Sequence, residues 1–70
     1  MAEVVKLRDE YIKLGQALKA AHVVDSGVDA KFAIEEGRVK VNGQVEYQRG
    51  KTLRGGDVVE YDGNTINIEA

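Results

Sequence analysis

The chain has 70 residues, a formal net charge of −2, a single histidine, and neither cysteine nor proline. Without cysteine it offers no disulfide, thiolate zinc site or thiol nucleophile, and His22 alone supplies too few ligands for a metal site. No apolar run approaches the ~18 residues that a membrane-spanning helix needs. We therefore expect one small domain across residues 1–70: a soluble, cytoplasmic binding module that is not an enzyme and uses no cofactor.

The N-terminal part of the chain predicts a short strand followed by a helix. Apolar and charged residues alternate over residues 4–8, which is typical of a strand. From Leu14 the apolar spacing changes to i, i+3, i+4 and i+7, one face of a helix of about two turns. This apolar stripe consists of Leu14, Ala17, Leu18 and Ala21. Three polar residues, Lys13, Gln16 and Lys19, fall away from the stripe and toward solvent.

A second helix is predicted from Ser26 to Glu36. Ser26 is a good N-cap, and Asp29 stands at the position from which a capping box is completed. Gly37 lies where a left-handed residue commonly ends a helix. The core is expected to include apolar residues from this helix and from a later strand: Ala30, Phe32, Ala33, Ile34 and Tyr61.

Asn42-Gly43 is a strong hairpin signal between two apolar-alternating segments. A two-residue loop at these positions would mix apolar and charged side chains on each face of the hairpin. A three-residue loop over residues 42–44 would separate the faces, and we expect this register because a slip of one residue reverses every side chain. The cross-strand pairs it predicts are Val41 with Val45, Val39 with Tyr47, Lys40 with Glu46 and Arg38 with Gln48.

The C-terminal part predicts a loop followed by a second hairpin. Residues 48–56 are polar and basic and contain three glycines, which indicates a mobile loop. Strands are expected over residues 57–61 and 65–69, joined by a tight turn at Gly63-Asn64. The N-terminal strand should join this sheet, because apolar residues near both termini would otherwise stay uncovered.

The charges are segregated along the chain. Residues 38–54 carry five bases and one acid, whereas residues 55–70 carry four acids and no base. Such segregation produces a local positive patch on an acidic protein. Several lysines and arginines at irregular spacing suit the phosphates of a nucleic acid, and they do not read its bases. Of the aromatic side chains only Tyr47 is expected to offer a stacking surface, so recognition of folded RNA is favoured over single strands.

Catalytic arrangements are not apparent in the sequence. His22 lies in an apolar connection, where a lone histidine is usually structural. Glu35 and Glu36 are adjacent on a helix and so do not converge on one substrate atom.

One run of sequence resembles a known family. Residues 26–43 (SGVDAKFAIEEGRVKVNG), followed by GDVVE at residues 56–60, are similar to the S4 RNA-binding domain, also called the αL motif. With LGQALK at residues 14–19 and RGK at residues 49–51, the chain looks like the stand-alone bacterial YaaA/YbcJ-type members. It departs from the wider family in having Gly27 and Val28 where many members place arginine.

This resemblance implies an α+β fold of two short antiparallel helices packed on a small, mainly antiparallel twisted sheet. It also implies binding of structured RNA, ribosomal or transfer RNA, by a monomer in a ribosomal or other ribonucleoprotein setting, without a membrane. By position in the motif, the implied RNA-binding residues are Lys31, Lys40, Arg49 and Lys51, then Arg38, Arg54 and Lys19.

Two other classes of function are compatible with parts of the sequence. VNG at residues 41–43 with GDVVE at 56–60 is also similar to ubiquitin-like sulfur carriers, but those need a free Gly-Gly tail and this chain ends in Glu69-Ala70. An acidic strand edge at Glu60, Asp62 and Glu69 suits a protein-interaction adaptor with a basic partner.

Overall fold

The computed structural model describes residues 2–70, which form two helices and seven strands. In chain order these elements are β1 (Ala2–Lys6), β2 (Ile12–Lys13), α1 (Leu14–Ala20), α2 (Gly27–Glu35), β3 (Val39–Val41), β4 (Gln44–Val45), β5 (Thr52–Leu53), β6 (Val58–Tyr61) and β7 (Asn64–Glu69). Neither of these helices is long and apolar enough to cross a membrane.

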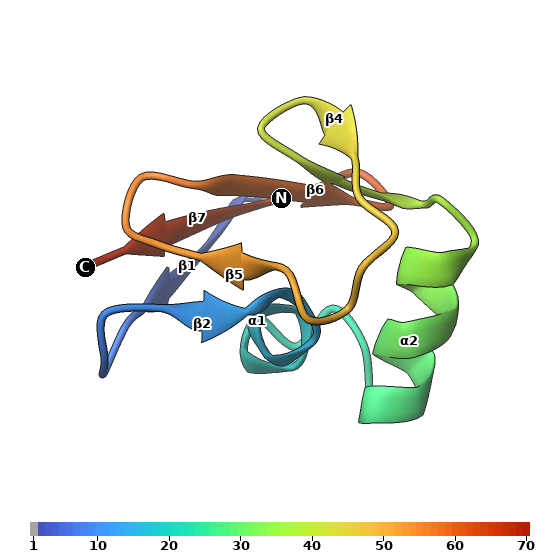
Figure 1. Cartoon of the computed structure of the whole chain (residues 1–70), viewed down its shortest axis with the longest axis horizontal. Coiled ribbons are helices and arrows are strands. Elements are labelled where there is room, and N and C mark those ends of the chain that lie inside the picture. The colour runs from blue at the N-terminus through green and yellow to red at the C-terminus, as the bar shows by residue number, and fades with distance from the viewer. Residues whose placement is uncertain (1) are drawn as a thin grey trace.

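Five of the strands form one mixed sheet, in the order β1-β7-β6-β3-β4, while β2 and β5 pair separately. β1 runs parallel to β7, and every other pair is antiparallel. Figure 1 shows both helices on the same side of the five-stranded sheet, with the β2–β5 pair beside α1. The predicted α+β fold is confirmed, and so is the expectation that the N-terminal strand joins the C-terminal hairpin.

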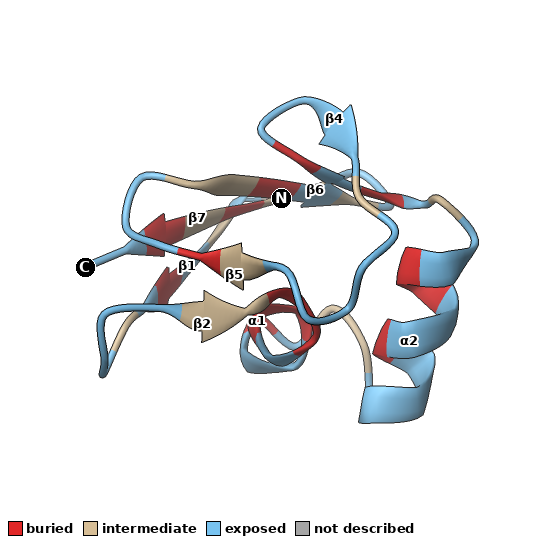
Figure 2. Cartoon of the chain, viewed as in Figure 1, coloured by how far each residue is buried: buried red, intermediate tan, exposed pale blue. Residues whose placement is uncertain are grey.

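The core lies between the five-stranded sheet and the helices (Figure 2). Apolar residues at alternate positions of the strands cover one face of the sheet: Val5, Val39, Val41, Val59, Ile66 and Ile68. From α1 and its C-cap comes the predicted apolar stripe of Leu14, Ala17, Leu18 and Ala21. α2 contributes Ala30, Ala33 and Ile34. Burial of these two periodic faces against each other is the main favourable term in the stability of the fold.

The structure confirms the residues predicted to begin and end α2, the Ser26 N-cap and Gly37. The Ser26 hydroxyl accepts a hydrogen bond from the Asp29 backbone N–H at 3.2 Å, which satisfies one of the unpaired donors of the first turn. Gly37 ends the helix with φ 75°. A Cβ at Gly37 would lie only 3.2 Å from the ring of Tyr47, so glycine is favoured here by the close approach as well.

The prediction that Phe32 belongs to the core is wrong. Its side chain is 56% exposed, because Ala30, Ala33 and Ile34 already turn the buried face of α2 toward the sheet. Tyr61, by contrast, is partly buried and packs against the core.

The expected register of the first hairpin is also wrong. Lys40 faces Val45 and Val41 faces Gln44, so the loop is the two-residue Asn42-Gly43 turn. Both turn residues have positive φ, 51° and 85°, as a type I′ turn requires. Burial does not select the register at this edge, because Gln44 and Val45 are both exposed. The Glu46 carboxylate binds the backbone N–H groups of Tyr47 and Gln48 rather than Lys40.

The C-terminal hairpin turns one residue earlier than predicted. Asp62 and Gly63 have φ 53° and 82°, and Tyr61 faces Asn64 across the turn. The expectation of a mobile loop over residues 48–56 fails at its centre, because β5 pairs with β2 and Leu53 is fully buried.

Asp57 ties the start of β6 to the Asn42-Gly43 turn. Its carboxylate accepts hydrogen bonds from the Arg54 backbone N–H at 2.8 Å and from the Asn42 amide at 3.1 Å. These interactions lower the pKa of Asp57. The hydrogen bond from Arg54 has the largest effect, followed by the one from Asn42 and then by the positive charges of Lys51 and Arg54.

Leu53 should contribute much of the stability of this small protein. Replacing it with alanine leaves a cavity in the core, and we expect a loss of about 2–5 kcal/mol in the free energy of unfolding, measured by urea denaturation. Arg54→Ala, at the neighbouring exposed position, is the control and should change stability by less than about 0.5 kcal/mol. If both variants changed the unfolding free energy equally, Leu53 would not be what anchors residues 48–56 to the core.

The hydrogen bonds to Asp57 predict how stability depends on pH. Because the folded-state pKa lies below the unfolded value of about 3.9, the stabilising contribution is fully present above that value. It is lost as the pH falls through the folded-state pKa. The difference in unfolding free energy between the wild type and Asp57→Asn should therefore shrink in acid. A difference that stays constant from neutral pH to about pH 2 would contradict this assignment.

Candidate nucleic-acid interface

A groove of about 340 Å³ lies between α1, the start of α2 and the segment that precedes β5. Three cationic side chains line it: Lys13, Lys19 and Arg49. Gln16 adds an amide, and the other lining residues are small: Gly15, Gly27, Ala30 and Gly50. None of the described residues that line this groove is acidic. It is therefore a concave, locally positive surface on a chain of net negative charge.

Backbone hydrogen bonds hold Arg49 at the groove. α1 has no side-chain N-cap, so the N–H groups of its first turn need other acceptors. The Leu14 N–H donates to the carbonyl of Lys51 at 2.8 Å, and the Gly15 N–H donates to the carbonyl of Arg49 at 3.1 Å. In Figure 1 the chain after β4 descends to α1 before it enters β5. The start of α1 thus positions the segment that carries Arg49.

The side chain of Arg49 packs on Gly15. A Cβ added at Gly15 would lie 2.8 Å from the Arg49 Cγ atom, closer than real contacts allow. The aliphatic part of Arg49 therefore rests against the backbone of α1, which leaves its exposed guanidinium to interact with a ligand. Glycine at position 15 is needed for this approach.

Lys13 is held from two sides. Its ammonium donates a hydrogen bond to the Thr52 hydroxyl at 3.0 Å and lies 5.4 Å from the centroid of the Tyr11 ring. Lys19, in the last turn of α1, is exposed. A cation at this end of a helix also interacts favourably with the helix dipole.

The sequence-predicted residues separate into two groups. Lys19 and Arg49 line the groove, while Lys31 follows Ala30 on α2 and Lys51 follows Gly50. Arg54 and Lys51 lie close enough to Asp57 to lower its pKa. Of these residues, Lys19 and Arg49 are the ones that line the groove. Arg38 and Lys40 belong to a different surface, a cavity that also contains Glu60 and Asp62.

Arg38 is largely neutralised by its neighbours. Its guanidinium lies 3.5 Å from the Glu36 carboxylate, 3.6 Å from the Asp62 carboxylate and 5.3 Å from the centroid of the Tyr61 ring. Tyr61 first, and then the two carboxylates, raise the pKa of Arg38, whereas desolvation opposes them. Its position among these groups makes Arg38 a weaker candidate for binding a polyanion than the groove cations.

The sequence analysis missed Lys13 as a site residue. The signal was present, since Lys13, Gln16 and Lys19 repeat every three residues on the side of α1 opposite its apolar stripe. Its contact with Thr52, 39 residues away, is visible only in the fold. No cluster of three or more His, Cys, Asp or Glu side chains suited to a metal ion occurs within residues 2–70.

Comparison with known proteins decides the family. A model of the S4 domain matches residues 5–69. The chain belongs to the S4 domain family. It is 44% identical over 63 residues to a probable ribosome maturation protein, RlbA, of Bacillus subtilis (strain 168), covering 90% of this chain and 89% of that protein. It is also 35% identical over 60 residues to YbcJ of Escherichia coli (strain K12), covering 86% of each chain.

The solved structure of YbcJ supports the same grouping. It superposes with a TM-score of 0.71 and 30% identity, covering 99% of this chain and 86% of YbcJ. That solution structure is described as revealing an αL motif involved in RNA binding. The resemblance to the S4 domain inferred from the sequence is thereby confirmed, and it favours this family over the ubiquitin-like sulfur carriers.

Gly15→Ala tests how the groove is built. The new methyl group would force Arg49 to leave its position, while the helical conformation at position 15 suits alanine. We expect the unfolding free energy to stay within about 1 kcal/mol of the wild type. The NMR signal of the Arg49 side-chain N–H should shift nevertheless. An unchanged Arg49 signal would contradict the contact with Gly15.

Proposed function

We propose that this protein binds structured RNA, ribosomal or transfer RNA, through the groove beside α1. Lys13, Lys19 and Arg49 contact phosphates there, and Lys31 and Lys51, each next in sequence to a residue that lines the groove, add positive charge. The observation that carries the proposal is the convergence of three cations from β2, α1 and the segment before β5. They share one groove to which no carboxylate contributes.

The groove suits a phosphate backbone in both charge and shape. Each phosphate neutralised by lysine or arginine releases condensed counterions, which is the main sequence-independent source of affinity. Gly27 and Gly50 have no side chain to block an approaching ribose or phosphate, and the space beside each is open. Within residues 2–70, the ion pairs closer than 4.0 Å are those of Arg38, so the groove cations are not neutralised by carboxylates.

Recognition by shape and backbone is favoured over stacking on single strands. Among residues 2–70 no aromatic side chain lines the groove itself, although Tyr11 stands beside Lys13. The exposed ring of Tyr47 rests on Gly37 at the end of α2. A helical RNA presents phosphates and 2′-hydroxyl groups at fixed spacing, which a rigid positive groove is able to match.

The relatives support a role connected with the ribosome. One is named for ribosome maturation, and the solved structure of the other is described by a motif involved in RNA binding. We propose that this chain acts as a monomeric, non-enzymatic module in the cytoplasm. Its partner would be a ribosomal RNA or a ribonucleoprotein particle.

The groove is tested by comparing two double variants of equal charge. Lys19→Gln with Arg49→Gln removes two groove cations, whereas Arg38→Gln with Lys40→Gln removes two cations from the mixed-charge surface. For a folded RNA hairpin, measured by fluorescence anisotropy, the groove variant should bind at least about tenfold more weakly. Its slope of log affinity against log salt should be smaller by about 2. The control variant should stay within about threefold of the wild type. Equal losses in both variants would reject the groove as the binding site.

A further inference from the structure

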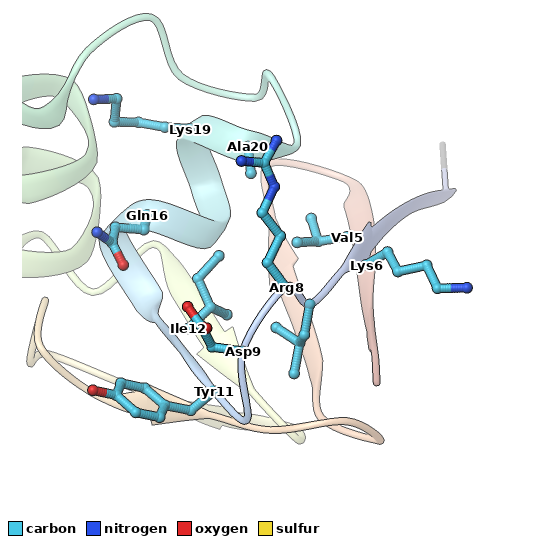
Figure 3. A pocket seen from close by; sticks show the side chains of 10 residues that line it. Val5, Lys6, Arg8, Asp9, Tyr11, Ile12, Gln16, Lys19 and Ala20 are labelled. Carbon is cyan, nitrogen blue, oxygen red and sulfur yellow. The ribbon is translucent and has the colours of Figure 1, made fainter.

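A second concavity borders α1 and shares Gln16 and Lys19 with the groove, but its other walls are different. It measures about 420 Å³, and its walls come from the end of β1, the loop of residues 7–11, Ile12 and α1 (Figure 3). Pockets that hold small organic groups have volumes of roughly 300–1,000 Å³. The space therefore suits one planar heterocycle.

The lining of this pocket combines apolar and charged residues. Val5 is buried, and Leu7 and Ile12 pack partly buried against the core, so the pocket has an apolar floor. Arg8 and Asp9 supply opposite charges at its rim. A site for phosphates alone would not need an apolar floor, whereas the face of a nucleobase does.

Arg8 is the side chain best placed to cover a ligand. Figure 3 shows it extending from the loop toward Ala20 of α1, whereas the ammonium of Lys6 points away from the pocket. Within residues 2–70, neither Arg8 nor Asp9 takes part in an ion pair shorter than 4.0 Å. A guanidinium plane is one of the surfaces on which proteins stack unpaired RNA bases.

The pocket adjoins the proposed RNA-binding groove. Gln16 and Lys19, three residues apart on the exposed face of α1, line both spaces. An RNA backbone held by Lys19 and Arg49 thus needs to cross only this ridge to bring its next nucleotide to the pocket. The Gln16 amide and the Asp9 carboxylate then offer both donors and acceptors to the edge of a base.

We propose that this pocket holds one unpaired nucleobase at the edge of the structured RNA bound in the groove. The inference rests on the proposed RNA-binding function and adds a single-stranded element to the target. Because the Asp9 carboxylate accepts hydrogen bonds, a base with an exocyclic amino group, such as adenine, is preferred over uracil. Arg8 covers the face of this base and contacts the adjoining phosphate.

The test uses three RNA probes: a blunt hairpin, the same hairpin with a short unpaired adenosine tail, and the hairpin with a uridine tail. Arg8→Ala is compared with Lys6→Ala, which removes one charge from the same segment, at a side chain whose ammonium points away from the pocket. Anisotropy titrations should show the wild type binding the adenosine-tailed hairpin about tenfold more tightly than the blunt one. The gain in affinity from the uridine tail should be smaller than the gain from the adenosine tail.

Arg8→Ala should lose this tail-dependent gain, whereas Lys6→Ala should keep it and bind every probe slightly more weakly. The pocket assignment is overturned if the wild type binds the blunt and tailed hairpins equally well, or if the two variants behave alike. That outcome would leave RNA binding by the groove intact. A wild type that binds none of the hairpins would instead reject the proposed function, and the pocket assignment with it.

Discussion

The site depends on how the first turn of α1 satisfies its backbone hydrogen bonds. No side chain caps this helix, and its N–H groups at Leu14 and Gly15 bind the carbonyls of Lys51 and Arg49. Unpaired backbone donors near a core are costly, so this helix start strongly favours a docked segment. Burial of Leu53 and the pairing of β5 with β2 hold the same segment from its other end. A stretch that reads as a mobile basic loop thereby becomes a fixed wall of a groove.

The acidic net charge is compatible with a polyanion as partner because the charges occupy different surfaces. Gly27 and Ala30 of α2 face the basic groove, whereas Asp29 and Glu36 line a cavity on another face of the same helix. Asp62, which follows β6, lies 3.6 Å from Arg38 and offsets its charge. Under the proposed function, this distribution leaves the groove as a positive surface for RNA on an acidic chain.

The sequence predicted the features that depend on local spacing. The apolar stripe of α1, the Ser26 cap and the Gly37 terminus follow from residues within one or two helical turns, so their prediction was reliable. The hairpin register failed because Val45 is exposed, and the separation of faces therefore carries no energy at that edge. The pairing of the two-residue strands β2 and β5 joins distant segments, and no local pattern marks it. Lys13 shares a three-residue repeat with Gln16 and Lys19, but its hydrogen bond to Thr52 depends on this distant pairing.

The most direct test of the groove as an RNA interface is an NMR titration of the isotope-labelled protein with a folded ribosomal RNA fragment. Backbone amide signals report on each element separately, and they do not depend on the choice of variants. Shifts should concentrate in residues 13–19, at Gly27 and in residues 49–51, and should weaken as salt is added. Shifts concentrated on β3 and β6 around Lys40 and Glu60 would contradict the central claim.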